Sequence, residues 1–127
     1  MSRSAALLLV VAGLFGALGV AAAAAAAHVA NAPRLQTVSL FLMLHGAALP
    51  GAVAAAHAFR LGRLLHWPMW TIALGVALFC GDLFIRVRTG ASLLPVAAPI
   101  GGSLTILGWL GLAAGSAYGG FTRGARG

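Results

Sequence analysis

Four long apolar segments, separated by short stretches rich in arginine, proline and glycine, run along this chain. They cover residues 4–28, 34–59, 67–85 and 93–118. A helix that crosses about 30 Å of hydrocarbon needs roughly 20 mostly apolar residues, and each segment is about that long. The pattern therefore predicts an all-α protein, a bundle of four transmembrane helices.

The composition supports a membrane environment. Of the 127 residues, 61% are hydrophobic and 7% are charged, whereas about 25% are charged in typical soluble domains. A soluble fold made from this chain would lack the polar residues needed to cover its surface. At this length we expect one integral membrane domain, residues 1–127, placed in a bacterial inner membrane.

A cleaved signal peptide is the alternative interpretation of the first segment. Its apolar run is longer than the roughly 7–15 residues of a typical signal-peptide core. We therefore expect this segment to be retained as a transmembrane helix.

The charges predict an orientation. The net charge of +7 comes from eight arginines, no lysine and a single acidic residue, Asp82. The arginines are scattered between the apolar segments, so they form no basic patch of the kind that binds nucleic acid. Arginines favour the cytoplasmic side. The side that holds both termini carries five arginines and the other side three, so both termini are predicted to be inside. The inner group is Arg3, Arg60, Arg63, Arg123 and Arg126; the outer group is Arg34, Arg86 and Arg88.

Small residues recur at intervals of four in three of the segments. In lipid, such rows mark places where helix backbones approach closely. An intramolecular bundle explains them, and one row remains available for self-association or a partner subunit. The rows are Gly19, Ala23 and Ala27; Ala47, Gly51 and Ala55; and Gly111, Gly115 and Gly119.

Asp82 and Arg86 are four residues apart and therefore share one face of the third helix. One interpretation is a structural ion pair near the helix end. The other is an ion, proton or substrate site, the usual hypothesis for an ionisable group inside a membrane.

His45 lies near the middle of the second segment. A neutral ring hydrogen-bonded to a neighbouring helix is one interpretation, and a proton relay or ligand contact is the other. No second histidine faces it at the same depth, so we expect no haem, which needs facing axial ligands in such a site. The single cysteine, Cys80, excludes an internal disulfide and a multi-cysteine metal site.

Five stretches together resemble a known family. They are Ala27-His28, Leu44-His45-Gly46-Ala47-Ala48-Leu49, residues 75–84, Ala98-Pro99-Ile100-Gly101-Gly102 and Gly108-Trp109-Leu110. In this order they resemble domain-of-unknown-function family 423, the small four-span membrane proteins related to transmembrane protein 256. The resemblance implies a four-span fold and carries no established activity.

The chain departs from the family pattern at two places. It reads Ala-Ala-His-Val around His28, where the family usually has Gly-Ala-His-Gly. It has Cys80 and Asp82 where the third-helix motif of the family usually has serines. A role of Asp82 is therefore expected to be particular to this branch.

With both termini inside, the matching pieces converge in the outer half of the bundle. We predict a polar cluster there, and the Pro99–Gly102 step leaves backbone groups open at the start of the last helix, as an anion site or as a tight turn. The predicted cluster consists of His28, Arg34, His45, Asp82, Arg86, Gly101 and Gly102.

No nucleophile with a base and an orienting group is recognisable, so we expect no enzyme activity, no cofactor and no metal. We predict a structural or accessory membrane protein that contacts lipids and forms a homo-oligomer or joins a larger membrane complex. The alternative is a small ion, proton or solute transporter that uses the cluster around Asp82.

Overall fold

A computed structural model describes residues 1–29 and 32–124 of the chain. It contains four helices, and no strand occurs in these residues: α1 (Arg3–His28), α2 (Pro33–Ala58), α3 (Gly62–Thr89) and α4 (Ala97–Gly124). Each helix is long and apolar enough to cross a membrane. The predicted all-α, four-span fold is therefore confirmed.

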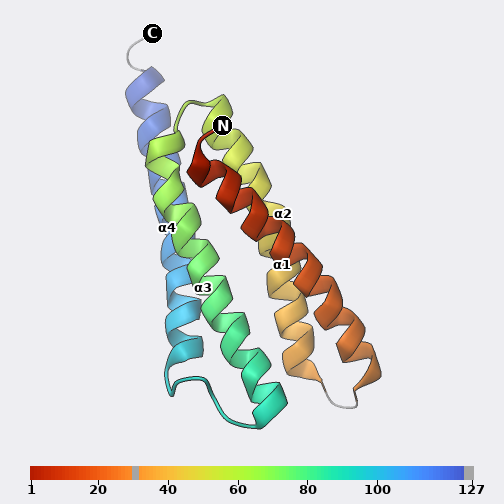
Figure 1. Cartoon of the computed structure of the whole chain (residues 1–127). Coiled ribbons are helices and arrows are strands. Elements are labelled where there is room, and N and C mark those ends of the chain that lie inside the picture. Colours follow the sequence, from red (N-terminus) through yellow and green to blue (C-terminus); the bar gives the residue numbers. More distant parts are fainter. Residues whose placement is uncertain (30–31, 125–127) are drawn as a thin grey trace.

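The helices form two antiparallel hairpins that lie side by side, α1 with α2 and α3 with α4 (Figure 1). Helix α2 packs on α3 and so joins the hairpins. We call the end that holds the N-terminus and the α2–α3 connection the terminal end. The opposite end, which holds the α1–α2 and α3–α4 connections, is the hairpin end.

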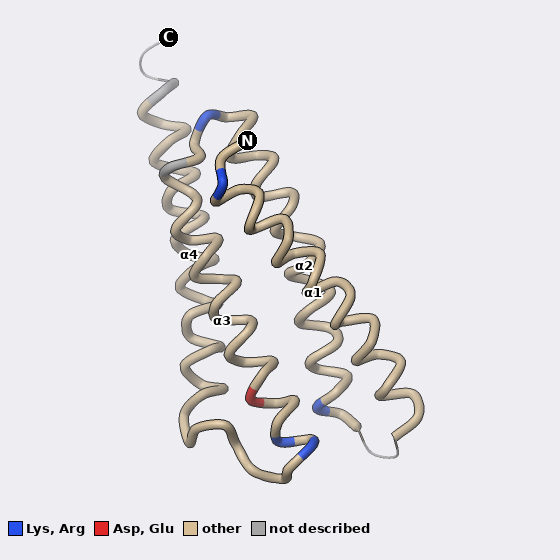
Figure 2. The backbone as a smooth tube through the Cα atoms, viewed as in Figure 1, with Lys and Arg blue, Asp and Glu red and all other residues tan. Residues whose placement is uncertain are grey.

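Charged residues gather at the two ends of the bundle, and the single acidic residue lies on α3 near the hairpin end (Figure 2). Arg3 is the first residue of α1, at the terminal end. Arg34 lies in the first turn of α2 and Arg88 in the last turn of α3, both at the hairpin end. Which end faces the cytoplasm stays a prediction. Arg126 and the side chains of Arg63 and Arg123, assigned to the inner side above, lie outside the described residues.

Two helices begin elsewhere than predicted. Helix α3 starts at Gly62 rather than residue 67 because Leu61 and Leu65, at its basic start, are buried against α4. Helix α4 starts at Ala97 rather than residue 93. Gly90, with φ 76°, ends α3 in the left-handed conformation that favours glycine, and the chain then needs several residues to turn back.

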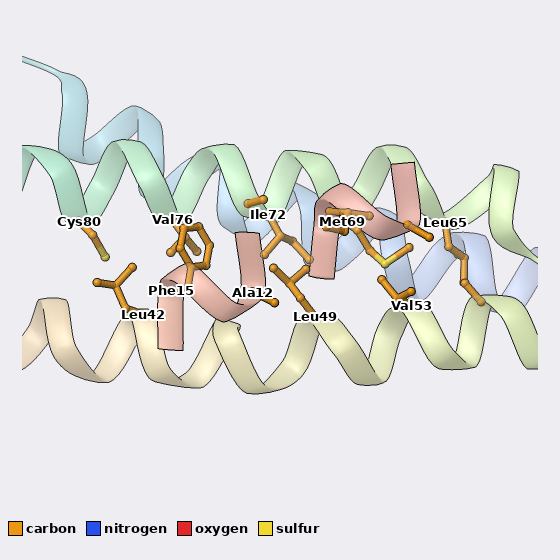
Figure 3. Close-up of a cluster of buried hydrophobic side chains, with 14 of the residues drawn as sticks. Ala12, Phe15, Leu42, Leu49, Val53, Leu65, Met69, Ile72, Val76 and Cys80 are labelled. Carbon is orange, nitrogen blue, oxygen red and sulfur yellow. The ribbon is translucent and has the colours of Figure 1, made fainter. Parts of the chain in front are cut away.

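The hydrophobic core lies between α1, α2 and α3, where Phe15, Leu42, Met69 and Val76 project into the shared space (Figure 3). Between 22% and 44% of each span is buried inside the chain. Most of each helix surface is therefore left to face hydrocarbon, which accounts for the many large apolar side chains on the outside.

Helices α3 and α4 approach most closely at glycines. A β-carbon added at Gly101 would lie 2.5 Å from the amide nitrogen of Phe79 and 2.8 Å from the carbonyl oxygen of Gly75. On α1 and α2, a β-carbon at Gly46 would lie 2.9 Å from the amide nitrogen of Gly16. The backbones themselves are therefore in contact within both hairpins.

The predicted small-residue rows have different uses. Gly111, Gly115 and Gly119 pack against side chains at the start of α3, so this row is intramolecular. In the α1 row, Gly19 is buried against Met43 of α2. The α2 row consists of Ala47, Gly51 and Ala55, and all three residues are exposed. We call this row the α2 small-residue face.

We expect Gly101→Ala to destabilise the bundle, because its methyl group would push α4 away from the α3 backbone. Overpacking of this kind costs about 1–3 kcal/mol. The neighbouring Gly102 is the matched control, since a β-carbon there meets only a Phe79 ring atom at 4.0 Å. Thermal or denaturant unfolding in one detergent should show a loss for Gly101→Ala and none for Gly102→Ala. Equal stabilities would contradict the close backbone contact.

Candidate functional site

Asp82 is fully buried, with 0% relative exposure, near the hairpin end of α3. One carboxylate oxygen, Oδ2, accepts a hydrogen bond of 2.7 Å from Nε of Arg86. The predicted Asp82–Arg86 pair is therefore present. The Arg86 side chain is 32% exposed and lies in the last turn of α3, where charge in a membrane costs less than at the centre of a span.

The second carboxylate oxygen of Asp82 bonds to the backbone. Oδ1 of Asp82 accepts a hydrogen bond of 2.7 Å from the backbone N–H of Leu93, in the connection between α3 and α4. Backbone groups at membrane depth need a partner, and this connection has no helix of its own to supply one. Asp82 thus holds the α3–α4 connection against the end of α3.

His45 forms a second polar centre, on α2, and is 3% exposed. Its Nδ1 lies 2.7 Å from the carbonyl oxygen of Phe41, and the indole N–H of Trp109 donates to its Nε2 at 3.2 Å. An indole nitrogen only donates and a carbonyl only accepts. The contacts therefore select the neutral ring with its proton on Nδ1, which matches the expected bond to a neighbouring helix.

Aromatic rings surround this histidine. The centroid of Phe41 lies 5.2 Å from that of His45 and 4.7 Å from that of Phe79, and the Trp109 ring lies 6.0 Å from His45. The group draws on α2, α3 and α4. The backbone of α4 packs along α3, and the Trp109–His45 bond adds a link from α4 to the first hairpin.

The other predicted cluster residues lie apart from these two centres. Gly101 is buried in the α3–α4 contact, and its carbonyl oxygen accepts the Thr105 hydroxyl at 2.9 Å. Gly102 is half-buried beside it, while His28 and Arg34 are exposed at the hairpin end. Within the described residues, no hydrogen bond joins the Asp82 pair to His45. The structure thus brings together Asp82 and Arg86 but distributes the rest.

Reasoning from the sequence missed three side chains as hydrogen-bond partners: Trp109, Trp70 and Ser4. Trp109 was noticed only as part of a family motif. The indole of Trp70 donates to the Ser4 hydroxyl at 2.9 Å and so links α3 to α1. A tryptophan inside a span needs an acceptor for its N–H, and this signal would have directed attention to both indoles.

The buried polar groups are satisfied within the chain. Among the described residues, no buried side-chain nitrogen or oxygen lacks a hydrogen-bond partner. In the same residues, no three His, Cys, Asp or Glu side chains are grouped so that they would hold a metal ion. The arrangement is suited to bracing helices against one another.

Comparison with known proteins agrees with the resemblance seen in the sequence. The family described as protein of unknown function DUF423 matches residues 12–102. A UPF0382 membrane protein of Haemophilus influenzae is 31% identical over 79% of this chain and 82% of its own length.

Two staphylococcal relatives match over shorter stretches. A UPF0382 membrane protein of Staphylococcus aureus is 32% identical over 59% of this chain, and one of Staphylococcus haemolyticus is 44% identical over 36% of it. The matched part spans 60% and 38% of the length of these two relatives. No solved structure gives a significant match.

We expect Trp109→Phe to weaken the link between α4 and the first hairpin, because His45 Nε2 loses its donor. The free energy of unfolding should fall by about 1–3 kcal/mol, the cost of leaving a buried acceptor unpaired. In the unchanged protein, nitrogen NMR of the His45 ring should show a protonated Nδ1 and a bare Nε2. The control is Tyr118→Phe on the same helix, since Tyr118 is 66% exposed. A proton on Nε2 would contradict the assigned bond.

Asp82 gives a prediction about the connection it holds. Asp82→Ala should speed hydrogen exchange of the Leu93 amide at least about tenfold, the effect expected for loss of one charge-assisted hydrogen bond. Asp82→Asn should have a smaller effect, because its side-chain oxygen can still accept from Leu93. Arg86→Gln removes the ion pair but keeps the hydrogen bond from the Leu93 amide to Asp82, so exchange of the Leu93 amide should change little. Similar exchange in all four proteins would refute the role of Asp82.

Proposed function

We propose a structural or accessory role in a membrane assembly for this chain, which belongs to the DUF423 family of proteins of unknown function. The observation that supports it most is the use of the interior polar groups. Asp82, His45 and Trp70 each bond to another part of the same bundle. The interior therefore serves the fold, and the outer surface is left for function.

A catalytic or transporting site needs a polar group with a free position for its substrate. Asp82 is fully buried, and its two oxygens already accept hydrogen bonds from Arg86 and from the Leu93 amide. His45 likewise has both ring nitrogens engaged. These contacts support a role without enzymatic activity, and they favour a structural role over a transporter coupled through Asp82.

The α2 small-residue face is the surface that we assign to the assembly. Ala47, Gly51 and Ala55 are exposed, and a β-carbon added at Gly51 would have nothing within 4 Å. Transmembrane helices associate through rows of this type because the backbones can come close. Within this chain, glycines at Gly46 and Gly101 are already used in that way.

The partner that best fits this face is a second copy of the chain. Two copies inserted in the same membrane with the same orientation have parallel α2 helices. A twofold axis along the membrane normal then places the α2 small-residue face against itself, as an isologous contact requires. Small residues on both sides allow the approach that a large side chain on either side would prevent.

We expect Gly51→Leu to convert an oligomer into monomers, because the new side chain would hold the two α2 backbones apart. Native mass spectrometry of protein extracted in lipid nanodiscs measures this directly. Gly13→Leu is the matched control, since Gly13 is also exposed and open on its helix but lies on α1. A monomeric unchanged protein would contradict the proposal. Recovery of a stoichiometric different protein would replace self-association by membership of a larger complex.

A further inference from the structure

An apolar cleft lies between α1, α2 and α3, and its volume is about 440 Å³. Phe15 and Leu18 line it from α1, Leu35 and Val38 from α2, and Cys80 and Phe84 from α3. Leu42 and Cys80 point toward one another across the space between α2 and α3 (Figure 3). The cleft therefore occupies the half of the bundle nearer the hairpin end.

A space of this size is comparable to ordinary ligand pockets, which hold about 300–1,000 Å³. Protein interiors are otherwise packed as densely as organic crystals. A half-open apolar cleft in a membrane span faces hydrocarbon, so the molecules that reach it first are lipids.

Basic side chains continue the lining of the cleft toward the hairpin end. Arg88 lies four residues after Phe84 and Arg34 four residues before Val38, so each shares the helix face of a lining residue. On α1, His28 lies three residues after the lining residue Ala25. All three side chains are exposed. The rim of the cleft is thus basic on each of its three helices.

Within the described residues, this rim has no counterion. The sequence contains one acidic residue against eight arginines, and that residue, Asp82, is bonded to Arg86. In the described residues, neither Arg34 nor Arg88 has a side-chain hydrogen bond or ion pair. An apolar cleft below an uncompensated cationic rim is complementary to one molecule that carries an anion above an apolar chain.

We propose that the cleft binds an anionic phospholipid, with one acyl chain along Phe15, Leu35 and Cys80 and the phosphate between Arg34 and Arg88. Guanidinium groups suit phosphate because their N–H groups form paired, charge-assisted hydrogen bonds with it. The site goes beyond the assembly role, and it uses a different part of the chain from the α2 small-residue face.

The first test compares two lipids on the full-length protein. Delipidated protein in detergent is titrated with dioleoylphosphatidylglycerol or with dioleoylphosphatidylcholine, and bound lipid is counted by native mass spectrometry. We expect a preference for the anionic lipid that Arg34→Gln with Arg88→Gln lowers at least about tenfold, the loss of one charge-assisted hydrogen bond. Arg3→Gln, at the terminal end, is the control and should keep the preference.

The second test fills the cleft. A β-carbon at Gly81 meets no atom within 4 Å, and Gly81 lines the cleft. Gly81→Phe should therefore abolish binding of the anionic lipid without lowering the unfolding temperature. Gly13→Phe, on the open face of α1, should leave binding of this lipid intact. Equal retention of both lipids, no effect of the arginine pair, or full binding by folded Gly81→Phe would each overturn the proposal.

Discussion

The hydrocarbon around this bundle does not drive its helices together, because lipid tails are as apolar as the side chains that they meet. Cohesion must come from close contact and from buried hydrogen bonds. The chain supplies the first at glycines: Gly46 brings α2 onto α1, and Gly101 brings α4 onto α3. Each contact places backbone against backbone, so many weak dispersion contacts form along the length of two helices.

Hydrogen bonds between the elements then fix how the hairpins and their connections sit. Ser4 with Trp70 joins α1 to α3, and His45 with Trp109 joins α2 to α4. Asp82 joins the end of α3 to the connection that follows it. In a medium without water each of these groups would be costly to leave unpaired. The polar residues therefore select one arrangement of helices that apolar packing alone would leave less specific.

The use of polar groups inside the bundle also explains which features lie on its surface. Among the described residues, the buried polar side chains have hydrogen-bond partners. Two features without a partner in these residues lie on the surface: an open row of small residues on α2 and a basic rim above an apolar cleft. One is suited to another backbone and the other to a charged amphiphile. These two surfaces are the basis for the proposal that the protein acts through what it binds in the membrane.

Sequence alone determined the four spans and the Asp82–Arg86 pair, because hydrophobic length and four-residue spacing are local properties of a helix. It did not determine that the second oxygen of Asp82 binds Leu93, or that His45 meets Trp109, 64 positions away. It also placed His28, Arg34 and His45 in one cluster, whereas His45 is buried against Trp109 and the other two side chains are exposed at the hairpin end. Those partners depend on which helix faces turn toward one another, and that is decided by packing between elements distant in the chain.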